Sequence, residues 1–245
     1  MEINRSIARR TRARCKTSIS KMKILNLYAC LGGNRYKWDE VTDVEVTAVE
    51  WDEELARLYK ERFPNDKVIV ADAHQYLLDH YKKYDFIWSS PPCPTHSRLN
   101  FSFKGKRQKN NNNSFKLKYP DMSLYQQIIF LDNFFDGKYV IENVIPYYEP
   151  LIAAKKRGRH LYWTNFNLPN TLSGVKNPDF TRLNKDHTKV MSEYHDYDFS
   201  KYKGKQPRKK IANNLVYYED GKIILDTVMG IIKKQNIKQT ELFEI

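Results

Sequence analysis

The sequence predicts an α/β fold in which a parallel sheet carries helices on both faces. Three observations favour this class. Between residues 23 and 142, short apolar runs alternate with segments that have helical spacing. The links between these segments are short, as expected where helices cross over between neighbouring parallel strands. The chain also has 17 Tyr, 12 Phe and 4 Trp among its 245 residues, which is enough apolar mass for one buried core.

Each element has its own local signal. Strands are expected where apolar and β-branched residues are grouped, at 23–28, 44–50, 68–71, 85–89 and 139–142. Helices are expected where apolar residues recur at helical spacing, at 53–63, 73–81 and 123–135. Asp52 stands directly before the first helix, as an N-cap would. The periodicity fades over 165–207, where turn formers dominate, and 222–230 is expected as a further strand or helix.

Composition excludes several classes of protein. The chain contains no run of about 18 apolar residues, which a membrane-spanning helix would need. Cys15, Cys30 and Cys93 form no Cys-x-x-Cys pattern, and the six histidines lack metal-ligand spacing, so neither a disulfide scaffold nor a metal site is expected. The expected location is therefore a reducing cytoplasm. We also expect the protein to be a monomer. The net charge of +13 indicates a polyanionic partner.

The positive charge is concentrated in two segments. Residues 1–21 hold seven Lys or Arg and one acid, and we interpret them as a disordered basic tail or a translational extension. Residues 97–118 hold seven Lys or Arg and no acid, around a run of four asparagines. Long loops of this kind inside a compact domain are usually functional or disordered, and we expect a long mobile loop here.

Polar groups follow every predicted strand, at the edge where a parallel sheet binds ligands. Gly32-Gly33 forms a turn whose backbone can approach a ligand closely, because glycine has no Cβ. Glu50 can take two ribose hydroxyls, Trp51 can stack on a ring, and Asp72 can accept from an adenine amino group. The pattern G-x-G-x-x-G is absent, which disfavours pyrophosphate, so S-adenosylmethionine fits better than a dinucleotide. Taken singly, the glycines could be only a turn, Trp51 a core residue and Asp72 a helix N-cap.

Cys93 follows the fourth predicted strand within Pro91-Pro92-Cys93-Pro94. Flanking prolines make a rigid turn and argue against a helix or strand interior, so the thiol is expected at the rim as a nucleophile. The alternative is a buried, inert cysteine. Glu142 follows the fifth strand and would lie near Cys93 if the fourth and fifth strands are neighbours. Arg157 and Arg159 add two cations that could equally be surface charge.

These residues, in this order and spacing, resemble the motifs of the C5-cytosine DNA methyltransferases, and most closely those of the small phage-type enzymes. The resemblance covers about residues 22–230. The matching motifs are Tyr28-Ala29-Cys30-Leu31-Gly32-Gly33, Glu50-Trp51, Asp72, Pro91-Pro92-Cys93, Glu142-Asn143-Val144, Lys155-Lys156-Arg157-Gly158-Arg159 and Asn213-Asn214-Leu215-Val216.

The resemblance implies a Rossmann-like S-adenosylmethionine-dependent methyltransferase sheet with helices on both faces and a small, irregular target-recognition region. The implied organisation is a catalytic core at 22–164, the target-recognition region at 165–207 and a C-terminal segment at 208–245 that returns to the core. The cofactor-binding residues implied are Tyr28, Ala29, Cys30, Gly32, Gly33, Glu50, Trp51, Asp72, Ala73, Pro91, Asn214 and Val216.

The resemblance also implies a reaction on a cytosine flipped out of double-stranded DNA. Cys93 would add to C6, and Glu142 would hold N3 and the exocyclic amine. Arg159 would bond the base O2, and Arg157 would support the site. The loop would contact the DNA backbone, through Ser97, Arg98, Lys104, Lys106, Arg107 and Lys109.

The chain departs from the family pattern at three motif positions and in one region. Cys30 replaces a loop glycine, Lys155 replaces a glutamine and Asn213 replaces a glycine, while the region 165–207 is short for target recognition. Two alternatives remain: an RNA (tRNA) cytosine-5 methyltransferase of related fold, and a non-catalytic nucleic-acid-binding module.

Overall fold

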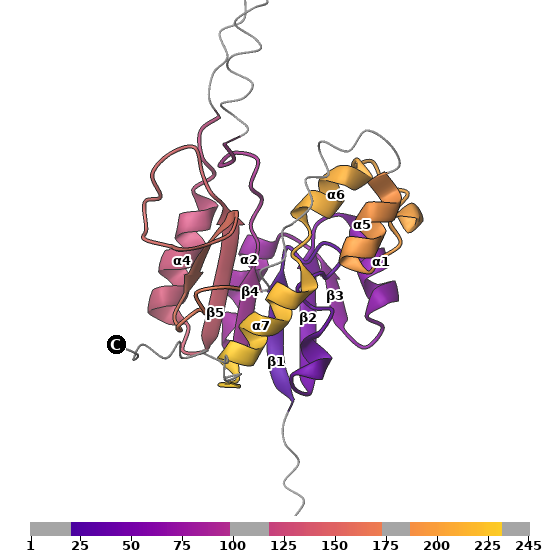
Figure 1. Ribbon diagram of the computed structural model, residues 1–245. Coiled ribbons are helices and arrows are strands. Elements are labelled where there is room, and N and C mark those ends of the chain that lie inside the picture. The colour runs from indigo at the N-terminus through magenta and orange to yellow at the C-terminus, as the bar shows by residue number, and fades with distance from the viewer. Residues whose placement is uncertain (1–20, 99–117, 173–186, 232–245) are drawn as a thin grey trace, which may run out of the picture.

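The computed structural model describes residues 21–98, 118–172 and 187–231. They form a seven-stranded sheet of order β3-β2-β1-β4-β5-β7-β6 (Figure 1). The strands are β1 Met22–Leu27, β2 Val44–Glu50, β3 Lys67–Val70, β4 Phe86–Ser89, β5 Lys138–Val144, β6 Lys155–Arg157 and β7 His160–Thr164. The first five run parallel, so their carboxyl ends meet at one edge.

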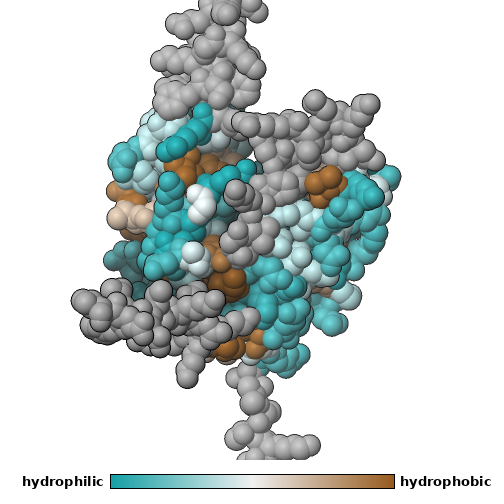
Figure 2. All heavy atoms as spheres, viewed as in Figure 1, coloured by the Kyte–Doolittle hydropathy of each residue, from teal (hydrophilic) through white to brown (hydrophobic). Residues whose placement is uncertain are grey.

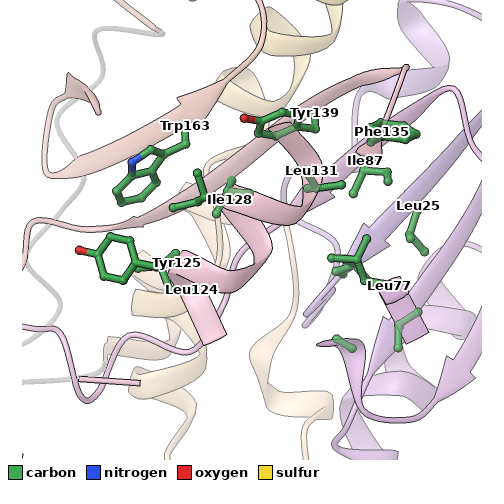
Figure 3. Packing of buried hydrophobic residues seen from close by; sticks show 14 of the residues in the cluster. Leu25, Leu77, Ile87, Leu124, Tyr125, Ile128, Leu131, Phe135, Tyr139 and Trp163 are labelled. Atoms are coloured by element: carbon green, nitrogen blue, oxygen red, sulfur yellow. The ribbon is translucent and has the colours of Figure 1, made fainter. Parts of the chain in front are cut away.

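Helices cover both faces of the sheet. They are α1 Glu53–Arg62, α2 Ala73–His80, α4 Ser123–Phe134, α5 His187–His195, α6 Arg208–Asn214 and α7 Tyr218–Val228, with 3₁₀ turns at Trp38–Glu40, Tyr81–Lys83 and Phe199–Lys201. Helices α2 and α4 pack on one face, where Leu77 and Leu131 join Leu25 and Ile87 of the strands (Figure 3). Helix α7 packs on the opposite face through buried Ile224 and Leu225, and α1 lies on the same side. The predicted fold class is confirmed.

Burial on both faces of the sheet explains why the strands are runs of mostly apolar residues. In β1, Ile24 and Leu25 are both fully buried although they point to opposite faces of the sheet. Parallel strands covered on both sides need this continuous apolar pattern. Helix α1 begins where the sequence predicts, because the Asp52 carboxylate accepts hydrogen bonds from the backbone N–H groups of Glu54 and Leu55.

The sheet differs from the purely parallel arrangement at its far end. Strand β7 runs antiparallel to β5, and β6 pairs with β7 as a hairpin. Gly158 in the connecting turn has a φ of +56°, a conformation in which glycine is favoured. The sequence Lys155-Lys156-Arg157 lacks the apolar character that predicts a strand, which explains why the hairpin was not expected.

The C-terminal part is more regular than its composition indicates. Helix α5 lies within the stretch 165–207, and the segment expected at 222–230 is helix α7, which begins at Tyr218. Gly221 lies inside α7 because a Cβ there would approach the carbonyl oxygen of Asn34 to 2.1 Å. This close backbone contact explains why glycine, which normally weakens a helix, is found at position 221.

Several expectations lie outside the described residues. These are the basic tail except for Lys21, the part of the basic loop that spans residues 99–117, residues 173–186 of the expected target-recognition region, and residues 232–245 of the C-terminal segment. Within the described ranges, no helix is long and apolar enough to cross a bilayer. No group of three or more His, Cys, Asp or Glu side chains in those ranges could hold a metal ion. On the face in Figure 2, the described surface is mostly hydrophilic, with apolar residues in small separate groups.

Candidate active site

A pocket of about 400 Å³ opens at the carboxyl ends of the parallel strands. This volume lies within the range of small-molecule and cofactor sites. Helix α6 lies above this edge of the sheet (Figure 1) and contributes to the wall of the pocket. The pocket brings together ten of the residues expected from the sequence, namely Tyr28, Cys30, Glu50, Trp51, Asp72, Ala73, Pro91, Cys93, Glu142 and Asn214.

The glycine turn supports the pocket without lining it. Gly32 has a φ of +67°, and a Cβ on Gly33 would lie 2.1 Å from the carbonyl oxygen of Val216. Gly33 therefore lets the segment after α6 pack directly on the turn after β1. Gly32 leaves room for the rings of Tyr59 and Phe63. Gly32, Gly33, Val216 and the buried Ala29 hold the loop in place, and none of them is part of the pocket wall.

Glu50 is fixed at the end of β2 by two backbone donors. Its Oε2 accepts from the N–H of Cys30 at 2.8 Å, and its Oε1 accepts from the N–H of Asp52 at 3.0 Å. Burial raises the pKa of Glu50, while these hydrogen bonds lower it. The carboxylate is thus held rigidly at the pocket wall, with lone pairs left to accept from a ligand hydroxyl.

Cys30 occupies a backbone conformation that normally favours glycine. Its φ is +48°, and its side chain lines the pocket. Burial, followed by the charge of Glu50, raises the pKa of the Cys30 thiol far above its ordinary value. The thiol is therefore neutral. It occupies space at the pocket wall, at the position where the motif of the resembled family has a glycine.

Trp51 and Asp72 present an aromatic ring and a carboxylate to the same pocket. Trp51 is 74% exposed, which excludes the alternative that it is a core residue. Asp72 caps α2, since its Oδ1 accepts from the N–H of Gln75 at 2.8 Å. The cap interpretation is therefore correct, and Asp72 also lines the pocket. Among the described residues no hydrogen bond to Oδ2 is found, so that oxygen can accept from a ligand.

The Pro-Pro-Cys turn is tied to the end of β5 by Asn143. The Asn143 Nδ2 donates to the carbonyl oxygen of Pro91 at 3.0 Å. The carbonyl of Cys93 accepts from the N–H groups of His96 and Ser97, both at 3.0 Å, which closes a tight turn after the thiol. Neighbouring strands and this amide bridge bring Cys93 and Glu142 into one pocket.

The thiol of Cys93 is not pre-ionised by its surroundings. Burial raises its pKa, and the charge of Glu142 raises it further, while the cation of Lys210 lowers it. Cys93 is only half-buried, so the interpretation of an inert core cysteine does not apply. Ionisation is therefore favoured by Lys210 and opposed by Glu142 within one cavity.

The two arginines of the hairpin lie in different surroundings. The Arg157 guanidinium donates to the backbone carbonyls of Lys156, Leu168 and Pro169, which anchors the start of the segment after β7. Arg159 is exposed at the hairpin turn. Neither side chain forms part of the pocket wall.

Of the expected DNA-binding residues, Ser97 and Arg98 lie in the described part of the chain. Ser97 forms a β-bridge with Pro146, and the Arg98 Nε donates to the Pro146 carbonyl at 3.2 Å. These contacts anchor the first residues of the basic loop beside the end of β5. Lys104, Lys106, Arg107 and Lys109 lie outside the described residues.

Sequence reasoning missed several residues of the pocket wall. Gln206 and Lys210 come from the segment at and before α6, and His160 comes from the unpredicted strand β7. Gln206 also donates from Nε2 to Asp52 Oδ2 at 3.0 Å, which links this segment to the start of α1. The cationic character of residues 201–210 was visible in the sequence, but its position beside the pocket depends on the fold.

Three solved structures have partial similarity to the chain. DNMT2 from Spodoptera frugiperda, solved as a variant, is 19% identical with a TM-score of 0.38, covering 59% of this chain and 49% of its own. The PH0226 protein from Pyrococcus horikoshii is 17% identical with a TM-score of 0.34, covering 53% and 52%. A SAM-dependent methyltransferase from Agrobacterium tumefaciens is 16% identical with a TM-score of 0.37, covering 57% and 42%. This chain thus spans about half the length of these structures. No curated protein matches the sequence.

A family model gives the assignment. The model of the C-5 cytosine-specific DNA methylases matches residues 22–145, which is just over half of the chain. The match begins with β1 and extends through the glycine turn, Glu50, Asp72 and Cys93 to the residues that follow β5. The chain therefore belongs to the C-5 cytosine-specific DNA methylase family.

Proposed function

We propose that the protein transfers a methyl group from S-adenosylmethionine to C5 of cytosine in double-stranded DNA, through a covalent bond between Cys93 and the base. The observation that carries this proposal is that Cys93 and Glu142 share one pocket with Glu50 and Asp72. A nucleophile and a carboxylate thus lie beside groups suited to an adenosine. Family membership supports the reaction type.

The pocket suits S-adenosylmethionine by the chemistry of its lining. Glu50 would accept from the ribose hydroxyls, Asp72 Oδ2 from the adenine amine, and Trp51 would stack on the adenine ring. When bound, the cofactor supplies an electrophilic methyl group. Tyr28, Cys30, Ala73, Pro91 and Asn214 would complete the walls, with Ala29, Gly32, Gly33 and Val216 supporting the loop.

The reaction would begin with the thiolate of Cys93 adding to C6 of a flipped cytosine. Glu142 would hold N3 and the exocyclic amine, which favours addition because N3 gains a proton as the ring becomes nucleophilic at C5. Arg159, at the turn beside the pocket, would contact the base O2, and Arg157 would support the hairpin. After methylation, loss of the C5 proton and of the Cys93 sulfur would release the product.

The proposed partner is double-stranded DNA, held partly by the basic segment that begins at Ser97 and Arg98 and continues through Lys104, Lys106, Arg107 and Lys109. Lysine and arginine contacts to phosphates would position the duplex without reading its sequence. We further propose that the protein works as a monomer in a reducing cytoplasm, where Cys93 stays a free thiol.

A methyl-transfer assay tests this proposal. The protein is incubated with methyl-labelled S-adenosylmethionine and either duplex DNA or tRNA, and the nucleosides are then separated. The expected result is labelled 5-methyl-2′-deoxycytidine from the duplex. Label only in 5-methylcytidine from tRNA would replace DNA by RNA as substrate. No label in either, with nucleic-acid binding retained, would favour a non-catalytic binding module.

A further inference from the structure

A contact between His160 and Glu142 lies inside the pocket and belongs to none of the motifs described above. The Nε2 atom of His160 is 3.4 Å from Oε1 of Glu142. In the antiparallel register, Glu142 is opposite Tyr162 and Val144 is opposite His160. Side chains at these positions share one face, so Glu142 and His160 are diagonal neighbours across the strand pair.

The contact is the one polar interaction that the described residues offer to the Glu142 carboxylate. The side chain of Glu142 is only 10% exposed and that of His160 is 27% exposed. No hydrogen bond to Glu142 from another side chain occurs within residues 21–98, 118–172 and 187–231. A carboxylate removed from water needs such a partner, because burying an unpaired charge is costly.

We propose that His160 is the positioning residue and proton partner of Glu142. This inference rests on the proposed function, since it assigns a role in the activation of cytosine. In this assignment His160 contacts the Glu142 carboxylate and acts through it, not on the reacting carbon atoms. Its ring would hold Glu142 in the orientation that faces N3 of the base.

The proton balance of the addition step explains why a histidine is useful here. The bond between sulfur and C6 forms as the C5–C6 double bond shifts its electrons toward N3. The imidazolium of His160 gives a proton to the Glu142 carboxylate, and the resulting carboxyl group passes its proton to N3. This leaves a carboxylate and a neutral imidazole. When the sulfur leaves, N3 returns its proton to Glu142 and Glu142 returns it to His160, so the pair recovers its starting state.

The surroundings of His160 contain charges of both signs. The nearby titratable or charged groups are Glu142 on β5, Arg157 opposite His160 on β6, the adjacent Arg159, Tyr162 on β7, and Cys93 and Lys210 on the same pocket wall. Glu142 is the acid among them. It is therefore the group that can stabilise a protonated His160.

Steady-state kinetics on substitutions at His160 provide the first test. His160→Phe should lower kcat by at least about 10-fold, with KM for S-adenosylmethionine unchanged. His160→Gln places an amide N–H donor at the same position beside Glu142, so it should recover part of kcat. His80→Gln, on α2 outside the pocket wall, is the matched control and should behave as wild type. A kcat within twofold of wild type for His160→Phe would overturn the proposal.

The rate at which iodoacetamide alkylates Cys93, read by mass spectrometry, tests the pair without relying on catalysis. The charge of Glu142 raises the pKa of Cys93, and the contact of His160 with the Glu142 carboxylate would weaken that effect. His160→Phe should therefore slow alkylation in the wild-type background and have no effect in the Glu142→Gln background. Equal effects in both backgrounds, or none in either, would contradict the pairing. If wild type methylates no cytosine while the alkylation result is as expected, the proposed function fails and the pair stands.

Discussion

Lys210 is the pocket residue whose positive charge favours ionisation of the Cys93 thiol. It lines the pocket with Cys93, and its charge lowers the pKa of the thiol against the opposing effects of burial and of Glu142. A thiol surrounded in this way ionises more readily when the cation is present or when the pH is raised. The residue that favours ionisation comes from the C-terminal segment, far in sequence from the residue that it assists.

Replacing Lys210 should therefore shift the pH dependence of methyl transfer. In Lys210→Gln the pKa of Cys93 rises further, so the acid limb of the kcat/KM profile should move to higher pH by up to about 1 unit. Lys205→Gln is the control, because Lys205 is exposed and lies outside the pocket wall. An acid limb at the same pH in Lys210→Gln and wild type would show that this cation does not influence the thiol.

The cofactor residues carry a second prediction at this scale. Glu50→Ala should weaken S-adenosylmethionine binding by about 1.5–3 kcal/mol, the usual effect of losing a hydrogen bond to a charged group. Asp72→Ser should weaken binding similarly, but it should keep the stability of α2, because serine also serves as an N-cap. Calorimetry measures the affinity and thermal unfolding measures the stability. Unchanged cofactor affinity in both variants would contradict the assignment.

At the scale of elements, strands and helices with their own local pattern could be predicted from the sequence. The capped helix α1 and the apolar strands β1 and β4 are examples. The hairpin β6–β7 could not, because Lys155-Lys156-Arg157 owes its strand conformation to pairing with β7 and not to its own side chains. His160 was missed because its place beside Glu142 depends on the pairing of β7 with β5. Cys93 and Glu142 were found because each lies at the carboxyl end of an apolar strand, Cys93 shortly after β4 and Glu142 in the last residues of β5.

The basic loop carries the prediction that belongs to this scale. Replacing Lys104, Lys106, Arg107 and Lys109 together with Gln should weaken DNA affinity and flatten its dependence on salt. Each phosphate contact contributes about −0.9 to the slope of log K against log salt, so the slope should fall by as much as ~3.6. Fluorescence anisotropy on a short duplex measures both quantities, and cofactor affinity should be unchanged. A slope equal to that of wild type would indicate that the loop does not contact DNA.

At the scale of the whole molecule, a buried polar network stabilises the turn that follows β1. Arg35 follows the glycine turn, and its Nε donates to Asp66 Oδ2 at 2.9 Å, where both side chains are at most 5% exposed. The hydroxyl of Tyr59 donates to the same Asp66 oxygen. This network joins the turn after β1 to α1 and to the entry of β3, so it supports the wall of the pocket at a distance.

Breaking this network should destabilise the entire fold. Asp66→Ala leaves a buried guanidinium without its main partner and should lower the free energy of unfolding by about 3–5 kcal/mol. Asp39→Ala removes the second carboxylate that pairs with Arg35. Because the side chain of Asp39 is 67% exposed, this change should lower the free energy of unfolding by less than about 1 kcal/mol. Urea unfolding compares the two variants. Equal losses of stability would contradict the view that burial makes the Arg35–Asp66 pair important.

Trapping the reaction on 5-fluorocytosine tests the central claim most directly. Fluorine at C5 cannot leave as a proton does, so a methylated base should remain bonded to the sulfur of Cys93. With wild-type protein, S-adenosylmethionine and a duplex containing 5-fluorocytosine, mass spectrometry should find a DNA adduct on Cys93 that carries one added methyl group. Cys93→Ser should bind the same duplex, form no adduct and lose methyl transfer by at least about 10³-fold. Methylation of ordinary cytosine by wild type without any adduct on Cys93 would contradict the account.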